Sequence, residues 1–279
     1  TFALVAEHGS FVAAAQALRI SPTKASRVVA ELEATLGTAL LHRTTRSVTL
    51  TDAGAHYLER CRHALDELDE AERTLRGEDA VPRGLLVVTA PVLFGRMLVR
   101  PVVNELLARH PALKVRLLLL DRVVRLAEEG VDVAVRIADL SDSSLRAVRL
   151  RETRRVLVAS PAYLERHGTP ATVAQLQDHA LISFDGFAPY DEWRFAGPGR
   201  PAVRLDARFA TNEMEAAIEA ALDGLGITRT FCYQVEAHVA VLDEFAPAPV
   251  PVSLVSQTQR QRSAALRAFL DLAKATLRA

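Results

Sequence analysis

The chain has 279 residues and no net charge, with 34 basic and 34 acidic side chains, and 49% of its residues are hydrophobic. At roughly 150 residues per domain, this length predicts two folded units. The composition is that of globular proteins and excludes disordered, collagen-like and disulfide-stapled chains. The apolar runs are shorter than the ~18 residues that a membrane span needs, and the two cysteines, Cys61 and Cys232, suit a reducing compartment such as the cytoplasm.

Two short helices joined by a tight turn are predicted near the start of the chain. Ser10 is expected to cap a helix that ends near Leu18. Ser21 followed by Pro22 is the start signal of a second helix, which Gly37 ends. This pattern is typical of a helix-turn-helix, which places its second helix in the major groove of DNA, although tight helix pairs also occur as plain packing.

Polar and basic side chains lie off the apolar stripe of the second helix, at its first turns. Lys24 and Arg27 can donate to guanine or phosphate, and Thr23 can contact a thymine methyl; an ordinary solvated face is the alternative. The next segment predicts a small hairpin, or wing, whose Arg43 and Arg46 suit phosphates. The expected DNA-contacting residues are Ser10, Ser21, Pro22, Thr23, Lys24, Ser26, Arg27, Arg43, Thr44 and Arg46.

A longer helix is expected from Asp52 to about Leu75. Its apolar residues follow heptad spacing, and about three heptads are too few for an isolated coiled coil, so we expect this helix to pair with a second copy. His56 and His63 lie close to this seam, but their spacing favours helix packing over a metal site. The predicted dimerisation residues are Leu58, Cys61, Leu65, Leu68 and Leu75.

Beyond a polar hinge, predicted strands and helices alternate. Continuous apolar strands separated by helices predict parallel sheets covered on both faces, here in two small α/β lobes. The predicted strands are 85–89, 115–120, 131–137, 155–159, 181–184, 209–211 and 226–228, and the predicted helices are 94–110, 123–129, 161–167, 213–222 and 263–277.

A small-molecule site is expected at the carboxyl ends of these strands. Thr211 and Asn212 begin a helix whose N-terminus favours an anionic group. Pro91 and Val92 supply an apolar wall that suits an aromatic ligand, and Arg136 is a candidate clamp for a carboxylate. The competing interpretation of Arg136 is an ion pair with one of the nearby carboxylates Asp132, Asp139 and Asp142. The full expected set is Pro91, Val92, Arg136, Phe184, Thr211, Asn212 and Thr228.

Several motifs together resemble the LysR-type transcriptional regulators. The N-terminal ones are 11–18, Ile20-Ser21, Ala25-Ser26-Arg27, Leu32-Glu33, Leu36-Gly37, 40–44 and 50–54. The C-terminal ones are 130–136, 159–168, Thr211-Asn212 and 224–227. The resemblance thus covers nearly the whole chain. It implies an N-terminal winged helix-turn-helix with a linker helix, followed by a two-lobed, periplasmic-binding-protein-like α/β effector domain.

The resemblance also implies the organisation and partners of the chain. The expected parts are a DNA-binding domain 1–54, a dimerisation helix 55–76, a hinge 77–84 and an effector-binding domain 85–279, with lobe I at about 85–158 and 245–279 and lobe II at about 159–244. The implied function is sequence-specific binding of double-stranded promoter DNA, modulated by a small-molecule effector, which the site residues above suggest to be anionic or aromatic. The implied partners are the effector, further copies in a homodimer or homotetramer, and RNA polymerase.

Two features depart from the family pattern. Thr1 falls inside what would be the first helix, and the connection from Glu236 to Phe245 is shorter than the usual crossover near Ala240. We expect residues to be missing at both places.

Other classes of protein have less support. A solute-binding protein would explain two lobes but not the N-terminal motifs. An enzyme is disfavoured because no catalytic constellation is present, and we expect no cofactor and no metal. The stretch 224–229 fails the dinucleotide-binding pattern, since Arg229 stands where the third glycine would be.

Overall fold

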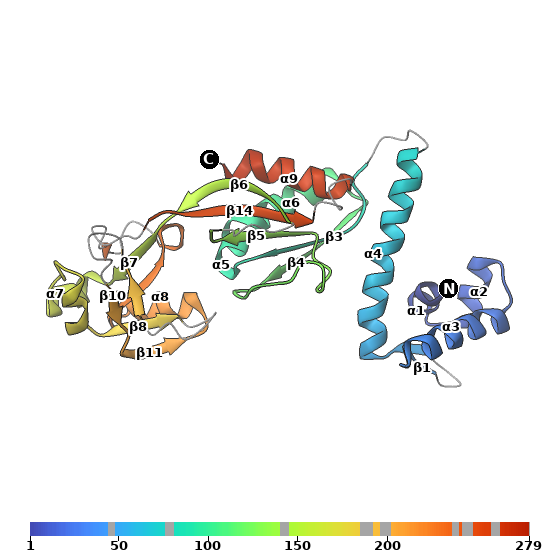
Figure 1. The fold of residues 1–279 in the computed structure, drawn as a ribbon, viewed down its shortest axis with the longest axis horizontal. Helices are drawn as coiled ribbons and strands as arrows, with labels where there is room; N and C mark the ends of the chain where they lie inside the picture. The colour runs from blue at the N-terminus through green and yellow to red at the C-terminus, as the bar shows by residue number, and fades with distance from the viewer. Residues whose placement is uncertain are drawn as a thin grey trace. The chain divides into compact units, whose positions relative to one another are not determined.

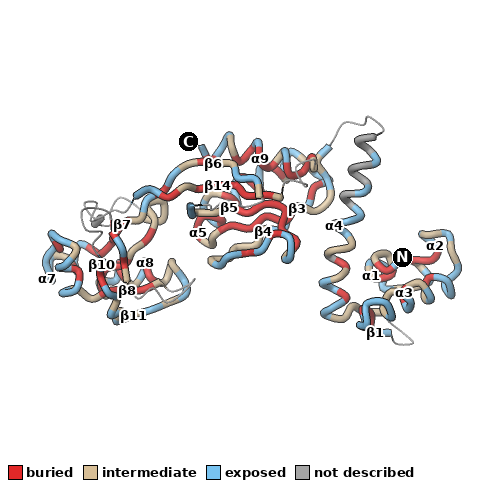
Figure 2. The backbone as a smooth tube through the Cα atoms, viewed as in Figure 1, coloured by how far each residue is buried: buried red, intermediate tan, exposed pale blue. Residues whose placement is uncertain are grey.

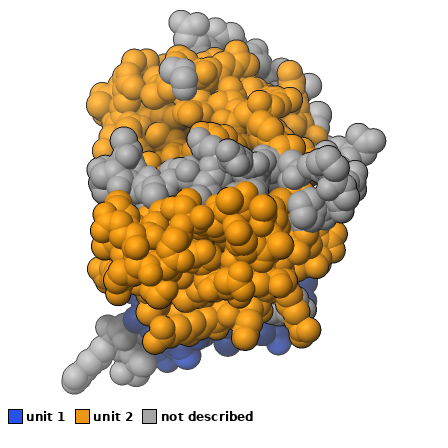
Figure 3. Space-filling model, turned by 90° about the vertical axis from the view of Figure 1, so that its left-hand side faces the viewer, with its two compact units in different colours: residues 1–80 blue, residues 81–279 orange. Residues whose placement is uncertain are grey.

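The computed structural model forms two compact units, residues 1–80 and residues 81–279 (Figure 3). It describes residues 1–43, 48–75, 81–139, 145–184, 192–195, 202–235, 240–241, 248–257 and 263–278, with only part of the side chains at 59–75 and none at 240–241. The expected wing-tip residues Thr44 and Arg46, the side chain of Leu75, residues 77–80 of the hinge and most of the connection from Glu236 to Phe245 therefore lie outside the described residues.

The first unit is a helix-turn-helix followed by a wing and a long helix (Figure 1). The predicted caps are confirmed: Ser10 Oγ accepts from the Ala13 amide at 3.3 Å and Ser21 Oγ from the Lys24 amide at 3.2 Å, while Gly37 ends the second helix with φ of 65°. The elements are α1 (Phe2–His8), α2 (Phe11–Leu18), α3 (Pro22–Leu36), β1 (Leu41–Arg43), β2 (Val48–Leu50) and α4 (Asp52–Leu75).

A small apolar core holds these elements together. Strands β1 and β2 pair antiparallel, so Leu41 lies opposite Leu50 at the base of the wing. The buried members of this core are Phe2, Val5, Ala14, Val29, Leu40, Leu41 and Leu58. The core therefore includes both helices of the helix-turn-helix, the wing and the start of α4.

The second unit contains two five-stranded sheets. The first has the order β4-β3-β5-β14-β6, and its core lies between the sheet and the helices α6 and α9 (Figures 1 and 2). Its elements are β3 (Gly84–Ala90), β4 (Leu113–Leu119), β5 (Val133–Ile137), β6 (Leu145–Thr153), β14 (Val250–Gln257), α5 (Val92–Phe94), the π-helix η1 (Gly95–Val99), α6 (Arg100–Arg109) and α9 (Ala264–Leu277).

The second sheet has the order β11-β8-β12-β7-β13. Helix α8 packs on it through Ala217 and Ala221, which lie in a cluster with Ile182 of β8. The elements are β7 (Arg155–Ala159), α7 (Pro161–His167), η2 (Ala174–Asp178), β8 (Leu181–Phe184), β11 (Ala207–Thr211), α8 (Met214–Leu222), β12 (Ile227–Phe231), η3 (Cys232–Gln234) and β13 (Ala240–Val241), with a separate hairpin of β9 (Glu192–Arg194) and β10 (Ala202–Arg204).

The prediction of purely parallel sheets is wrong. Strand β3 runs parallel to β4 and β5, but β14 runs antiparallel to β5 and β6, and β12 runs antiparallel to β7. The reason is that β6 leaves the first sheet and β14 returns to it, so these neighbours run in opposite directions. Strand β7 belongs to the second sheet, which places the boundary between the lobes near residue 154 rather than 158.

The predicted helix 123–129 is also wrong, because this stretch is irregular and ends in a turn. Its apolar spacing is satisfied without a helix: Val124 and Leu126 are buried against β3 and β5 residues. The carboxylate of Glu129 accepts from the Arg125 amide at 3.0 Å and pairs with Arg122, which closes the loop. The apolar spacing that predicted two turns of helix therefore belongs to a buried loop.

Candidate nucleic-acid interface and effector site

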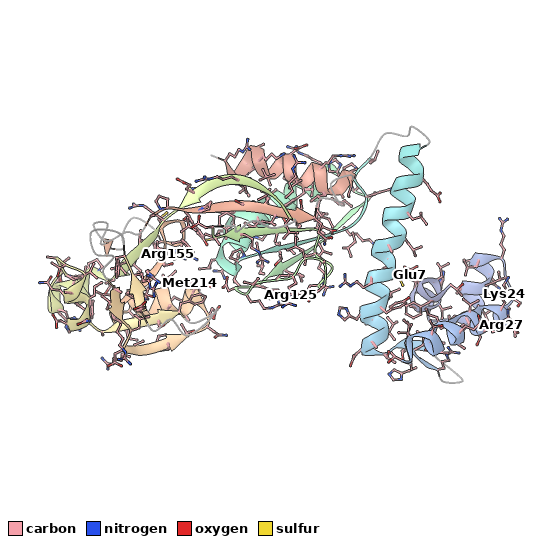
Figure 4. All side chains as sticks on the ribbon, viewed as in Figure 1. Glu7, Lys24, Arg27, Arg125, Arg155 and Met214 are labelled. Carbon is pink, nitrogen blue, oxygen red and sulfur yellow. The ribbon has the colours of Figure 1, made fainter. Side chains whose placement is uncertain are left out.

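The first turns of α3 present an exposed polar and basic surface. Ser21, Pro22, Thr23, Lys24 and Arg27 are all exposed, as predicted from the apolar stripe. Figure 4 shows Lys24 and Arg27 pointing outward from the first unit. This is the geometry that a recognition helix needs to reach base edges in the major groove.

Arg27 is paired only loosely within its own helix. Its Nε lies 3.3 Å from Glu31 Oε1, and the two side chains are 73% and 66% exposed. Such exposed pairs contribute little to stability, so Arg27 can exchange Glu31 for a DNA group at small cost.

Arg43 of the wing is held more firmly than the sequence suggested. Its Nη2 donates to Glu33 Oε2 at 2.5 Å, its Nη1 lies 3.4 Å from Ser26 Oγ, and its guanidinium lies 5.1 Å from the centre of the Phe11 ring. Burial tends to raise the pKa of Glu33, but hydrogen bonds from the Leu40 and Leu41 amides and the neighbouring Arg43 hold it below its ordinary value. The carboxylate is therefore charged at neutral pH.

The predicted dimerisation seam of α4 divides into two parts. Leu58 is buried and Cys61 packs beside it in the core of the first unit, so both serve the chain's own fold. Leu65 and Leu68 are 52% and 57% exposed. An ion pair between Arg62 Nη2 and Glu7 Oε1, 3.0 Å apart, joins α4 to α1 on the N-terminal side of these leucines. The exposed half of the seam is the part that a partner helix would cover.

The expected effector residues of the first lobe lie at the end of β3 and in β5. Pro91 and Val92 are partly buried, and the Val92 amide donates to Asp121 Oδ1 at 3.0 Å. Burial raises the pKa of Asp121 above its ordinary value. Arg136 Nη2 donates to the Val124 carbonyl at 2.8 Å. Of the carboxylates considered as its partners, Asp142 lies outside the described residues. The role of Asp121 was not predicted, because the amide that it accepts from is 29 positions away in the chain.

The expected effector residues of the second lobe differ in accessibility. Asn212 is exposed, Thr211 Oγ1 accepts from the Glu213 amide at 3.1 Å, and Phe184 is partly buried at the end of β8. Thr228 is fully buried and donates to the Ile182 carbonyl at 3.1 Å. The strand continues to Phe231, so Thr228 is not at its carboxyl end as predicted.

Contacts between the two lobes were not predicted. Arg96 of η1 forms an ion pair with Glu215 of α8. Tyr233, in η3 between β12 and β13 of the second sheet, packs edge-on against Phe94 of α5 with ring centres 5.2 Å apart, and stacks on Phe231 at 5.9 Å. Burial and nearby Asp121 raise the pKa of Tyr233. No local pattern joins residues this far apart in the sequence, so only the fold brings them together.

The described residues contain neither a candidate metal-ligand cluster nor a helix that could cross a membrane. No group of three or more histidine, cysteine, aspartate or glutamate side chains in the described ranges is arranged to hold a metal ion. Among the helices described, none combines the length and apolar character required to cross a bilayer.

Family models match both parts of the chain. Residues 1–55 match the bacterial regulatory helix-turn-helix of the lysR family, and residues 79–278 match the LysR substrate binding domain. The relatives reported below are transcriptional regulators rather than enzymes.

Individual relatives agree along nearly the full length. The HTH-type transcriptional regulator CrgA of Neisseria meningitidis serogroup C (strain 8013) is 30% identical over 277 residues, covering 97% of this chain and 93% of CrgA. An HTH-type transcriptional repressor of Pseudomonas aeruginosa (strain UCBPP-PA14) is 33% identical over 280 residues, covering 97% of this chain and 88% of the repressor.

Solved structures give the same result. The structure of CrgA superposes with a TM-score of 0.64 at 30% identity, covering 99% of this chain and 96% of CrgA. Together with the match at residues 1–55, this result disfavours the solute-binding alternative, which has no use for a helix-turn-helix. The chain is a LysR-type transcriptional regulator, with a DNA-binding helix-turn-helix and an effector-binding substrate domain.

Proposed function

We propose that this regulator reads a promoter sequence through the exposed first turns of α3. The observation that carries the proposal is the shared outward face of Lys24 and Arg27, with Arg27 in an exposed pair with Glu31. Ser10, Ser21, Pro22, Thr23 and Ser26 flank this face, and the wing residues Thr44 and Arg46 are proposed to contact phosphates. We place this activity in the cytoplasm, where the DNA is.

The test is selection of bound sequences from a random duplex pool, at a salt concentration that suppresses non-specific binding. We expect an inverted repeat with half-sites about one helical turn, roughly 34 Å, apart. Lys24→Ala and Arg27→Ala should each weaken binding to that site by about 1–3 kcal/mol. Arg46→Ala should weaken binding to all sequences and lower the salt slope by about one. Unchanged DNA binding in all three variants would refute the assignment of this face to DNA recognition.

Self-association through α4 is the second part of the proposal. Leu65 and Leu68 form an exposed apolar stripe on a charged helix, and the same stripe on a second copy is its natural cover. Leu58, Cys61 and Leu75 complete the heptad seam, with Leu58 and Cys61 shared with the core of the first unit. A symmetric dimer presents two α3 helices to two half-sites; a tetramer would add contacts elsewhere.

The third part of the proposal is an effector site at the carboxyl ends of β3, β5, β8 and β11. Pro91, Val92, Phe184, Thr211 and Asn212 are the proposed contacts, with Arg136 beside them held by the Val124 carbonyl, while the buried Thr228 is no longer part of the proposed site. A ligand there acts on the connection between the lobes that Arg96 and Glu215 bridge.

Effector control is tested by screening anionic and aromatic metabolites for a shift in thermal stability, then measuring operator affinity with each ligand that binds. Coupling between effector and DNA should be about 1–3 kcal/mol and reciprocal. Transcription with purified RNA polymerase then tests whether the regulator acts through that partner. Ligands that bind without altering operator affinity, DNA bending or transcription would exclude effector control.

A further inference from the structure

Glu33, near the end of α3, binds three groups of the wing. Its Oε1 accepts from the Leu40 amide at 2.8 Å and from the Leu41 amide at 3.0 Å. Its Oε2 accepts from Arg43 Nη2 at 2.5 Å, and the Glu33 side chain is 16% exposed. One carboxylate of the recognition helix therefore caps the first strand of the wing and holds that strand's arginine.

Arg43 extends the same connection across the face of the helix-turn-helix. Its guanidinium lies over the Phe11 ring of α2 and reaches Ser26 in the middle of α3. The contacts with Glu33 and Ser26 engage both terminal nitrogens, whereas the ion pair described above for Arg27 is an exposed one within its own helix. Arg43 thus joins the wing to both helices of the DNA-binding motif.

The opposite side of the same wing segment is held by the start of α4. The Thr51 amide donates to the Leu40 carbonyl at 3.0 Å, and Thr51 Oγ1 donates to the Ala39 carbonyl at 2.8 Å. Gly54 approaches so closely that a β-carbon there would lie 1.9 Å from the Leu40 carbonyl oxygen. Residues 39–41 are therefore bound by α3 on one side and by α4 on the other.

We propose that Glu33 is a positioning residue for DNA binding. It fixes the wing, through Arg43 and the amides of Leu40 and Leu41, in the orientation in which α3 and the wing contact DNA together. The proposal rests on the DNA-binding face proposed above. A wing that is already fixed in the free protein loses less conformational entropy on binding DNA, so fixing the wing increases the affinity for the operator. Arg43, in this reading, acts on DNA through the placement of the wing rather than as a phosphate contact.

The test compares Glu33→Gln with the matched control Glu31→Gln, which lies on the same helix but in an exposed pair. Affinity for the selected operator and for an unrelated duplex is measured over a range of salt concentrations, at a temperature where circular dichroism shows each variant folded. We expect Glu33→Gln to lose about tenfold or more in operator affinity, since the ion pair with Arg43 is lost and the two amide hydrogen bonds lose their charged acceptor. Glu31→Gln should stay within about twofold.

A double-mutant cycle with Arg43→Gln separates positioning from direct contact. If Arg43 acts with Glu33, the single and double variants lose similar factors and the salt slope is unchanged. A salt slope lowered by about one in Arg43→Gln, with losses that add to those of Glu33→Gln, would make Arg43 a phosphate contact and overturn the proposal. Full operator affinity in folded Glu33→Gln would overturn it as well.

Arg43→Lys keeps the test decisive if Glu33→Gln does not fold. Lysine retains the charge that a phosphate contact needs but cannot reproduce the forked contacts to Glu33 and Ser26. The proposal expects a loss of operator affinity with an unchanged salt slope, and wild-type affinity would refute it. If wild-type protein selects no operator at all, the reading face of α3 has failed, and that outcome is distinct from a failure confined to Glu33.

Discussion

Replacing Leu65 and Leu68 together by alanine should separate the dimer that we propose on α4. Full burial of a leucine side chain contributes about 1.5–3 kcal/mol. These two side chains are 52% and 57% exposed, so a partner helix can still gain about half of that, roughly 1 kcal/mol for each leucine. Four leucines meet across two copies, which gives about 4 kcal/mol per dimer, or about a thousandfold in the dissociation constant.

The assay is sedimentation velocity of fluorescently labelled full-length protein from nanomolar to micromolar concentration. Alanine retains the β-carbon and favours helix, so the expected weakening is about a hundredfold to a thousandfold with α4 still helical. Leu36→Ala is the control, because Leu36 is 44% exposed but lies at the end of α3. An unchanged association step, or an equal loss in the control, would refute the assignment of this seam to dimerisation.

Three further predictions concern stability, each measured by urea unfolding. Gly54→Ala should destabilise the first unit by about 3 kcal/mol, because the added carbon meets the Leu40 carbonyl, which is backbone and cannot rotate away. Burial and the nearby charge of His167 lower the pKa of His179 below 6.5, so near this pH the unfolded chain binds more protons than the folded one. The free energy of unfolding should therefore decrease as the pH falls from about 6.5 through the pKa of the folded state. His179→Gln should reduce this dependence on pH. Asp132→Ala should cost about 1–3 kcal/mol, because it leaves a buried β3 amide without its acceptor.

Local signals in the sequence were sufficient for the DNA-binding unit. Ser21, Pro22 and Gly37 each act within a few residues, so the start and end of α3 could be predicted from side-chain chemistry alone. The exposure of Lys24 and Arg27 followed from the apolar stripe on the opposite face. The role of Arg43 did not follow, because the contacts that hold it come from α2 and α3, and a sequence pattern shows its charge but not its partners.

The effector-binding unit was harder to predict because its organisation depends on distant pairing. Strand β14 lies between β5 and β6, although in the sequence it begins 113 positions after the end of β5 and 97 positions after the end of β6. Nothing local distinguishes a parallel neighbour from an antiparallel one when both faces of a strand are buried. The same reason explains Thr228, whose buried position depends on β8 lying beside it.

The connection between the two sheets of the effector-binding unit has a consequence for how such regulators diversify. Only Arg154 separates β6 from β7, and its carbonyl accepts from the Cys232 amide at 2.9 Å. An inserted or deleted residue here would shift one strand against its neighbours and exchange the faces of its side chains. Insertions and deletions should therefore accumulate in the loops at the strand ends, where new ligands can be accommodated. The one-residue connection between β6 and β7 should keep its length among related regulators.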